Sequence, residues 1–172
     1  MTLFPDLPPG TAVITACGRY RYRLAYELGG EGPSVSVGMI NPSTADGVAL
    51  DATMRKVIGF ARMLRARQLV VWNLFAWRDK DVRALARAVD PVGPENDAWT
   101  ERALRETEIR IVAWGPSAKL PARLRDRWRL ATAIAAGAGA ELQCWGTAGD
   151  GQPRHPLMLS YATPLTPWER PE

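Results

Sequence analysis

Two polar side chains stand where apolar runs of the sequence end or are interrupted. Asn41 directly follows the apolar run 34–40, and Asn73 lies inside the run 68–75. A carboxamide offers one acceptor oxygen and two donor hydrogens, so Asn41 can hold a water molecule or the edge of a base. Because burying an unpaired amide costs about 1–3 kcal/mol, Asn73 needs either a partner in the core or a ligand.

His155 is the single histidine of the chain, and it lies between Arg154 and Pro156 after the glycine-rich loop 146–152. The adjacent prolines restrict the backbone, which favours a side chain presented to a ligand over one that is only solvated. The sequence has neither a second histidine nor a CxxC pair, so we expect no metal site and no cofactor.

Each of these residues also has a structural interpretation. Asn41 can be a turn asparagine that satisfies local backbone groups, and a core partner for Asn73 would explain that residue equally well. The loop that continues through Ser43 can bind an anion with its backbone N–H groups or can simply lead into a helix. Asp51 is explained as the N-cap of that helix.

The elements that must position these residues alternate between strand and helix. Apolar and alternating runs predict strands over 19–28, 34–40, 68–75, 109–114 and 141–145, with helices over 53–67, 82–88, 94–107 and 121–136. This order predicts an α/β fold of three α/β/α layers, with a central, mainly parallel four-stranded sheet plus an N-terminal strand. Ligands of such sheets bind beyond the carboxyl ends of the strands. We therefore expect one crevice to be faced by Asn41, Asn73 or Arg78, Gly115 and His155.

Composition indicates one globular domain over residues 1–172, with its core at about 19–160. The chain is 47% hydrophobic and 23% charged, and no apolar stretch approaches the roughly 18 residues of a membrane helix. We expect a cytoplasmic monomer that does not bind membranes. The net charge of +4 is carried mostly by arginine, which suits phosphate binding but is equally typical of a GC-rich genome.

Four short motifs occur in order along the chain: Met39-Ile40-Asn41-Pro42, Val70-Val71-Trp72-Asn73-Leu74, Ala113-Trp114-Gly115 and His155-Pro156-Leu157-Met158-Leu159-Ser160. Together they resemble the motifs of the uracil-DNA glycosylase superfamily, and the resemblance covers about residues 35–160. The chain is also similar to an uncharacterised bacterial domain family of unknown function. That family has the same Asn-Pro-Ser-Thr-Ala-Asp and Arg-His-Pro-Leu segments, found here at 41–46 and 154–157.

The resemblance implies a DNA glycosylase, which hydrolyses the N-glycosidic bond of a damaged or modified base flipped out of duplex or single-stranded DNA. It implies that Asn41 positions the attacking water and that His155 donates a hydrogen bond to the oxygen that gains charge as the base leaves. Asn73 would read the edge of the base. The resemblance places further residues at the substrate, namely Ile40, Pro42, Ser43, Gly115 and, stacked on the base, Phe75 or Trp72. It places three residues on the DNA backbone, namely Arg78, Arg154 and Ser160.

Two other functions remain open from the sequence. One is a non-catalytic module that binds a nucleotide or modified base in the same pocket, and the other is a hydrolase of a free nucleoside or nucleotide. Leu157 stands where the glycosylase superfamily carries a phosphate-binding serine, and Gly38 is displaced by one residue from its usual place. These departures favour a substrate other than plain uracil, or a loss of activity.

Overall fold

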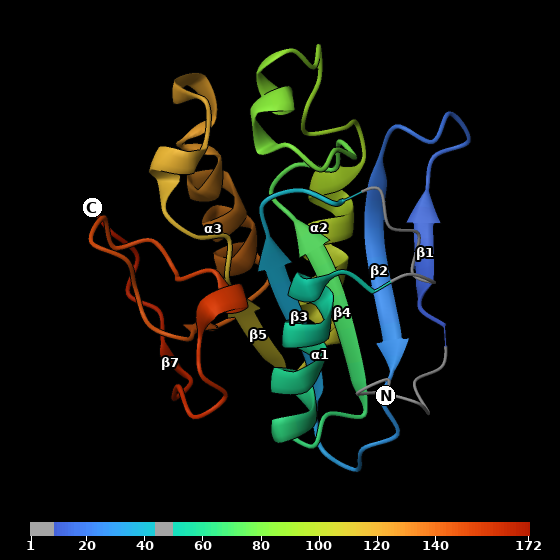
Figure 1. The fold of residues 1–172 in the computed structure, drawn as a ribbon, viewed down its shortest axis with the longest axis vertical. Helices are drawn as coiled ribbons and strands as arrows, with labels where there is room; N and C mark the ends of the chain where they lie inside the picture. Colours follow the sequence, from blue (N-terminus) through green and yellow to red (C-terminus); the bar gives the residue numbers. More distant parts are fainter. Residues whose placement is uncertain (1–8, 44–49) are drawn as a thin grey trace.

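The computed structural model describes residues 9–43 and 50–172, and its strands form one twisted sheet with helices on both faces (Figure 1). The strands are β1 (Thr11–Ile14), β2 (Arg21–Glu27), β3 (Ser34–Met39), β4 (Gln68–Asn73), β5 (Ile109–Val112), β6 (Leu142–Cys144) and β7 (Thr166–Pro167). The α-helices are α1 (Ala52–Met63), α2 (Asn96–Glu106) and α3 (Arg127–Gly137). Short 3-10 helices follow several strands, namely η1 (Val82–Ala86), η2 (Ser117–Lys119), η3 (Ala122–Leu124) and η4 (Pro156–Met158).

The sheet has the strand order β1-β2-β4-β3-β5-β6-β7. The α/β class predicted from the sequence is confirmed, but the predicted four-stranded, mainly parallel sheet with one added strand is wrong. Seven strands form the sheet in the described part of the chain, and the pairs β1–β2, β2–β4 and β6–β7 are antiparallel. The pairs β4–β3, β3–β5 and β5–β6 are parallel. The two missed strands are short edge strands, and β7 contains a proline, so neither has a hydrophobic period long enough to detect.

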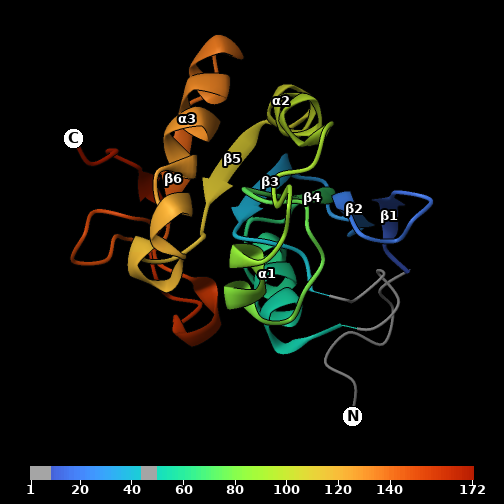
Figure 2. The same cartoon turned by 90° about the horizontal axis from the view of Figure 1, so that it is seen from above.

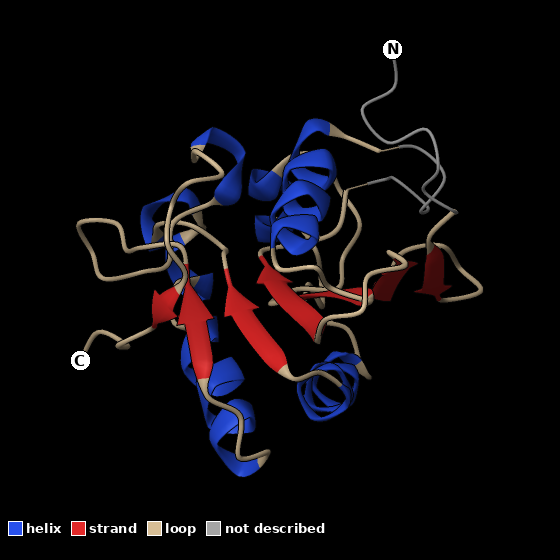
Figure 3. Ribbon diagram, turned by 90° about the horizontal axis from the view of Figure 1, so that it is seen from below, coloured by secondary structure: helices blue, strands red, loops and turns tan. Residues whose placement is uncertain are grey.

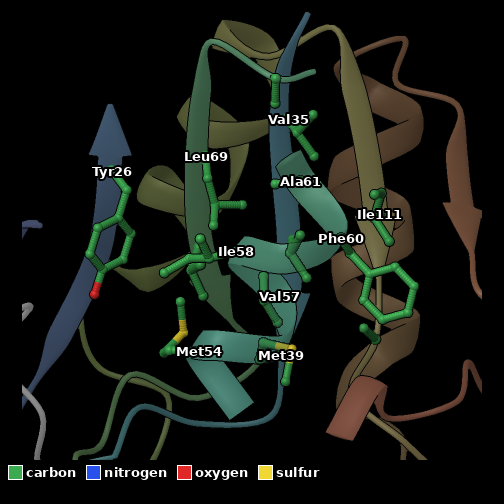
Figure 4. Close-up of a cluster of buried hydrophobic side chains, with 14 of the residues drawn as sticks. Tyr26, Val35, Met39, Met54, Val57, Ile58, Phe60, Ala61, Leu69 and Ile111 are labelled. Carbon is green, nitrogen blue, oxygen red and sulfur yellow. The ribbon is translucent and has the colours of Figure 1, made fainter. Parts of the chain in front are cut away.

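The helices divide between the two faces of the sheet. Helix α1 covers one face, and α2 and α3 cover the other, as the views along the sheet show (Figures 2 and 3). The core under α1 is mostly aliphatic, and Met39 and Met54 lie at the end of it where α1 begins (Figure 4). The core under α2 and α3 is rich in tryptophan and contains Trp72, Trp114, Trp128 and Trp168.

Local sequence explains where α1 begins and ends. The Asp51 side chain accepts a hydrogen bond of 2.8 Å from the backbone N–H of Met54, which caps the first turn as predicted. The apolar side chains at helical spacing along α1, including Val57, Phe60 and Ala61, are buried. The helix ends earlier than predicted because Arg65 adopts a positive φ of 55°, which a helix cannot contain. Among the described residues, no helix has the length and apolar character needed to cross a membrane.

Candidate functional site

A cavity of about 370 Å³ opens at the carboxyl ends of the central parallel strands, on the α1 face of the sheet. This volume lies in the lower part of the range of about 300–1,000 Å³ that is typical of small-molecule sites. The cavity has apolar and polar walls, and the residues that line it are Arg21, Met39, Ile40, Asn41, Ser43, Asp51, Thr53, Met54, Val71, Asn73, Asp79, Lys80, Asp81, Val82, Lys119 and His155. The structure thus brings Asn41, Asn73 and His155 to one place from three distant parts of the chain.

Strand pairing places the two asparagines side by side. Met39 and Asn73 are parallel partners at the ends of β3 and β4. The pairing continues past the strands, since the backbone N–H of Phe75 donates to the carbonyl of Ile40 at 2.9 Å. Asn41 is therefore the first residue that is free to turn away from the sheet.

Asn73 is a buried amide that lacks a protein partner for its donor. Its side chain is 2% exposed, and its Nδ2 has no hydrogen-bond partner among the described residues. An unsatisfied buried donor costs free energy, which makes such groups uncommon unless a ligand or water completes them. Asn73 lines the cavity, so its side-chain amide belongs to the cavity wall, although Nδ2 itself has almost no exposed surface.

Asn41 is held in one orientation by its own amide group. Its Nδ2 donates to the backbone carbonyl of Asp79 at 2.9 Å and to that of Pro42 at 3.3 Å. The oxygen Oδ1 must then point away from these carbonyls, and it is the group that Asn41 can offer to a ligand or water as an acceptor. The two interpretations of Asn41 thus apply to different atoms of its side chain. Nδ2 satisfies local backbone carbonyls, as a turn asparagine does, and Oδ1 is the atom that can accept from a water or a base.

His155 lines the cavity, and a hydrogen bond fixes the form of its neutral ring. Its Nδ1 accepts a hydrogen bond of 3.3 Å from the backbone N–H of Leu157, so the neutral ring carries its hydrogen on Nε2. Burial lowers the pKa of His155 below its ordinary value, and the positive charge of Lys119 lowers it further, while Asp51 acts in the opposite direction. The neutral form, a donor from Nε2, is therefore favoured at neutral pH.

Gly115 positions the segment that carries His155. Its φ of +84° requires glycine, and a Cβ atom there would lie 3.3 Å from the Cβ of His155. The backbone N–H of Gly115 donates to the carbonyl of Pro153 at 2.9 Å, and buried Gln152 accepts a hydrogen bond of 2.8 Å from Trp114 Nε1. The end of β5 is thereby joined to the segment before His155, so Gly115 supports the site although it does not line the cavity.

The cavity also contains a buried cation that the sequence analysis missed. Arg21 is 3% exposed, and burial lowers its pKa to about 10, which leaves it charged at neutral pH. A regular alternation of tyrosines and arginines along β2 would place the side chain of Arg21 outward. The pairing with β1 explains the inward position of Arg21, because Val13 pairs with Arg23 whereas the next residue, Ile14, pairs with Arg21. Strand β2 thus has one residue more than β1 between these pairs, and this bulge breaks the alternation of its side chains.

The remaining predicted residues divide into two groups. Ile40 and Ser43 line the cavity, whereas Pro42 does not, and Phe75 is fully buried in the core under α2 and α3. None of the three residues predicted to bind the DNA backbone lines the cavity. Arg78 donates to the carbonyl of Gly18 at 2.8 Å, Arg154 is exposed, and the hydroxyl of Ser160 accepts from the N–H of Ala162 at 3.2 Å. Thr44 and Asp46, which belong to the Asn41 loop, lie outside the described residues.

Carboxylates and ammonium groups share the rim of the cavity. Asp51, Asp79 and Asp81 line it together with Lys80 and Lys119. Two of the carboxylates are engaged locally, since Asp79 accepts from the N–H of Asp81 at 2.9 Å and Asp81 binds Arg83.

Within 9–43 and 50–172, no group of three or more histidine, cysteine or acidic side chains is arranged to hold a metal ion.

Comparison with known proteins gives one match. A family model described as "Protein of unknown function (DUF1643)" matches residues 21–157. The chain matches none of the curated proteins and none of the solved structures. The match confirms the predicted similarity to a domain family of unknown function. The comparisons add no support for the resemblance to the uracil-DNA glycosylase superfamily, which stays a prediction.

Proposed function

Because the chain belongs to the DUF1643 family of proteins of unknown function, we propose a function from the site itself: hydrolysis of the N-glycosidic bond of a damaged or modified base in DNA. The observation that carries this proposal is the convergence of Asn41, Asn73 and His155 on one cavity of about 370 Å³. The motifs around these residues resemble those of the uracil-DNA glycosylase superfamily, and that resemblance suggested the same three residues.

The proposed recognition of the base uses the floor of the cavity. The side-chain amide of Asn73 pairs with the base edge after a rotation that uncovers its unpartnered Nδ2, and this bond removes the cost of leaving the buried donor unsatisfied. Met39, Met54 and Ile40 line the cavity with apolar atoms that can cover the faces of the ring. No phenylalanine, tyrosine or tryptophan lines the cavity in the described part of the chain, so these aliphatic and thioether groups take the place of a stacking ring.

The proposed chemistry uses Asn41 and His155. Oδ1 of Asn41 accepts a hydrogen bond from a water molecule and orients it towards C1′ of the sugar, since the Nδ2 side is held by Asp79 and Pro42. The water oxygen bonds to C1′ as the bond from C1′ to the base nitrogen breaks, and the water proton ends on the released base. Nε2–H of His155 donates to the base oxygen that gains charge, an interaction worth about 10²- to 10³-fold in rate.

A panel of DNA substrates tests this proposal. Single-stranded and duplex oligonucleotides with one deaminated, oxidised, alkylated or enlarged base are incubated with the full chain, and abasic sites are measured as alkali-labile strand breaks. We expect breaks with at least one modified base, and formation of these breaks should be at least about a hundredfold slower with Asn41→Ala or His155→Ala. Arg170→Ala is the control, because Arg170 is exposed in the C-terminal segment away from the cavity. If the wild-type chain leaves every substrate intact, the proposal is wrong.

One observation favours a second candidate, a hydrolase of free nucleosides. Asp51, Asp79 and Asp81 line the cavity, and carboxylates suit the hydroxyl groups of a sugar better than the phosphates of a DNA backbone. Release of free base from nucleosides, with no abasic sites in any oligonucleotide, would favour this candidate. Its binding would also lack the steep salt dependence of phosphate contacts.

A further inference from the structure

A second cavity adjoins the first one along a shared stretch of chain. It has a volume of about 530 Å³, and Asp79 lines both cavities. Trp77 and Arg87, which precede and follow η1, line only the second cavity. The carbonyl of Asp79 also accepts a hydrogen bond from the amide of Asn41, so the residue shared by the two cavities contacts the first cavity's Asn41 directly.

Two aromatic rings line this second cavity in fixed positions. Tyr20 and Trp77 are both half-buried, and their rings pack edge to face with centroids 5.6 Å apart. The hydroxyl of Tyr20 donates to the carbonyl of Asp90 at 2.9 Å, and its ring stacks on Tyr22. The rings are thus held before any ligand binds, which lowers the entropic cost of stacking a planar group on them.

The charged groups of the second cavity differ in how they are engaged. Asp90 accepts hydrogen bonds from the N–H groups of Val92 and Gly93, and Asp79 accepts one from Asp81, so both carboxylates shape their own loops. Arg19 and Arg87 are exposed and form no salt bridge among the described residues. Fixed rings beside exposed guanidinium groups are the combination that binds the base and the phosphate of a nucleotide.

We propose that the second cavity binds the nucleotide next to the flipped one in single-stranded DNA, with its base against Tyr20 and Trp77 and its phosphate on Arg19 and Arg87. This inference rests on the proposed function, because it takes the first cavity as the site of the flipped base. Single-stranded DNA is the class assigned, since a base within a duplex stays paired and stacked and does not enter a side cavity.

Fluorescence anisotropy of labelled 15-nucleotide DNA tests the inference, because it reads binding and not base release. Trp77→Ala should weaken single-strand binding by about 5- to 150-fold, the range for loss of one stacked base. Arg87→Glu should weaken it by about tenfold and reduce the slope of log affinity against log salt by about 0.7, the value for one phosphate contact on a single strand. Duplex DNA of the same length should bind more weakly and respond little to Trp77→Ala.

Arg170→Glu is the matched control, since it reverses the charge of an exposed arginine that lines neither cavity. The C-terminus lies at the edge of the molecule opposite β1 (Figure 1). It should leave single-strand affinity within about twofold of the wild type. Thermal unfolding checks that the Trp77→Ala variant is folded. Arg87→Glu keeps the test valid if Trp77→Ala does not fold, because Arg87 is exposed and its substitution should not disturb the core.

The outcomes separate this inference from the proposed function. Unchanged single-strand affinity in both Trp77→Ala and Arg87→Glu, or an equal loss on duplex DNA, overturns the inference even where base excision is observed. Loss of affinity in both variants supports the inference. If that loss occurs while no modified base is excised from any substrate, the proposed function fails and the DNA-binding role of the second cavity stands.

Discussion

Two buried asparagine side chains lie at the end of β4, on opposite faces of the sheet. Asn73 is the last residue of β4, and Asn96 belongs to α2. Asn96, on α2, is 1% exposed, and its Nδ2 donates to the carbonyls of Asn73 and Leu74 at 2.9 and 3.2 Å. Asn73 itself is 2% exposed, and its Nδ2 has no partner in the described chain. Each amide keeps one atom without a hydrogen-bond partner among the described residues, Oδ1 in Asn96 and Nδ2 in Asn73, but only Asn73 lines the cavity.

This contrast extends to the two faces as a whole. Under α2 and α3, tryptophans fill the space, and Trp114 meets Trp72 and Trp168 edge to face. Under α1, the core stops short of the strand ends, where Met39 and Met54 line the cavity instead of closing it. Both faces thus bury a hydrophobic core, but only the α1 face leaves a cavity at the strand ends.

The largest effect is expected on the tryptophan-rich face. Trp114→Ala should lower the free energy of unfolding by about 3–5 kcal/mol, because it leaves a void among packed rings and removes the partner of buried Gln152. Urea denaturation measures this loss. A decrease below about 1 kcal/mol would show that this face is not a tightly packed core.

On the cavity face, the corresponding change should affect activity and spare stability. We expect His155→Ala to reduce the rate of base release by about 10²- to 10³-fold, because a hydrogen-bond donor to the leaving base is lost. The free energy of unfolding should change by less than about 1 kcal/mol, since His155 is only partly buried. Single-turnover kinetics on the best substrate measure the rate. A reduction of less than about threefold would remove His155 from the proposed chemistry.

The two asparagines give a matched pair of substitutions with different expected effects. Asn96→Leu should lower the free energy of unfolding by about 1–3 kcal/mol, because two buried carbonyls lose their donor. Asn73→Leu should leave stability unchanged or raise it by up to about 1 kcal/mol, since it removes an unsatisfied buried donor. It should also abolish base binding, measured by calorimetry. Equal destabilisation by both variants would contradict a ligand role for Asn73.

The smallest effect expected is a pH dependence that comes from His155. Burial and Lys119 lower its pKa in the folded chain, so the unfolded chain binds more protons between the two pKa values and stability rises with pH there. The contribution of His155 to the free energy of unfolding is fully present above the ordinary histidine pKa of about 6.5. It is lost as the pH falls through the lowered pKa of His155 in the folded chain. Urea denaturation of the wild type and of His155→Gln measures it. If the difference in free energy of unfolding between the wild type and His155→Gln does not change with pH, the lowered pKa of His155 is contradicted.

Hydrophobic runs in the sequence were enough to predict the elements that carry the site. The runs at 34–40 and 68–75 are continuous because β3 and β4 are buried on both faces, and the side chains that follow them were expected at one edge of the sheet. Asn41, Asn73 and His155 all line the cavity there. The edge strands β1 and β7 escaped prediction because four and two residues are too few for a period.

Features that depend on irregular backbone could not be predicted in the same way. Arg21 enters the cavity because the pairing of β2 is irregular, which the alternation of its sequence does not reveal. Phe75 continues an apolar run past the end of β4, yet its side chain joins the core under α2 and α3. The role of Gly115 depends on its positive φ and on the approach of His155, which are tertiary features.

Side-chain amide NMR of Asn73 and Asn96 tests the central claim most directly, because the two groups lie close together but should respond differently to a ligand. Free nucleobases and 2′-deoxynucleosides are titrated into the ¹⁵N-labelled chain, and Asn73→Leu and Asn96→Leu assign the two signals. The structure predicts that binding of a base shifts the Asn73 side-chain amide and leaves that of Asn96 in place, because only Asn73 lines the cavity. An unchanged Asn73 signal, or equal shifts of both signals, would contradict a base-binding cavity at the end of β4.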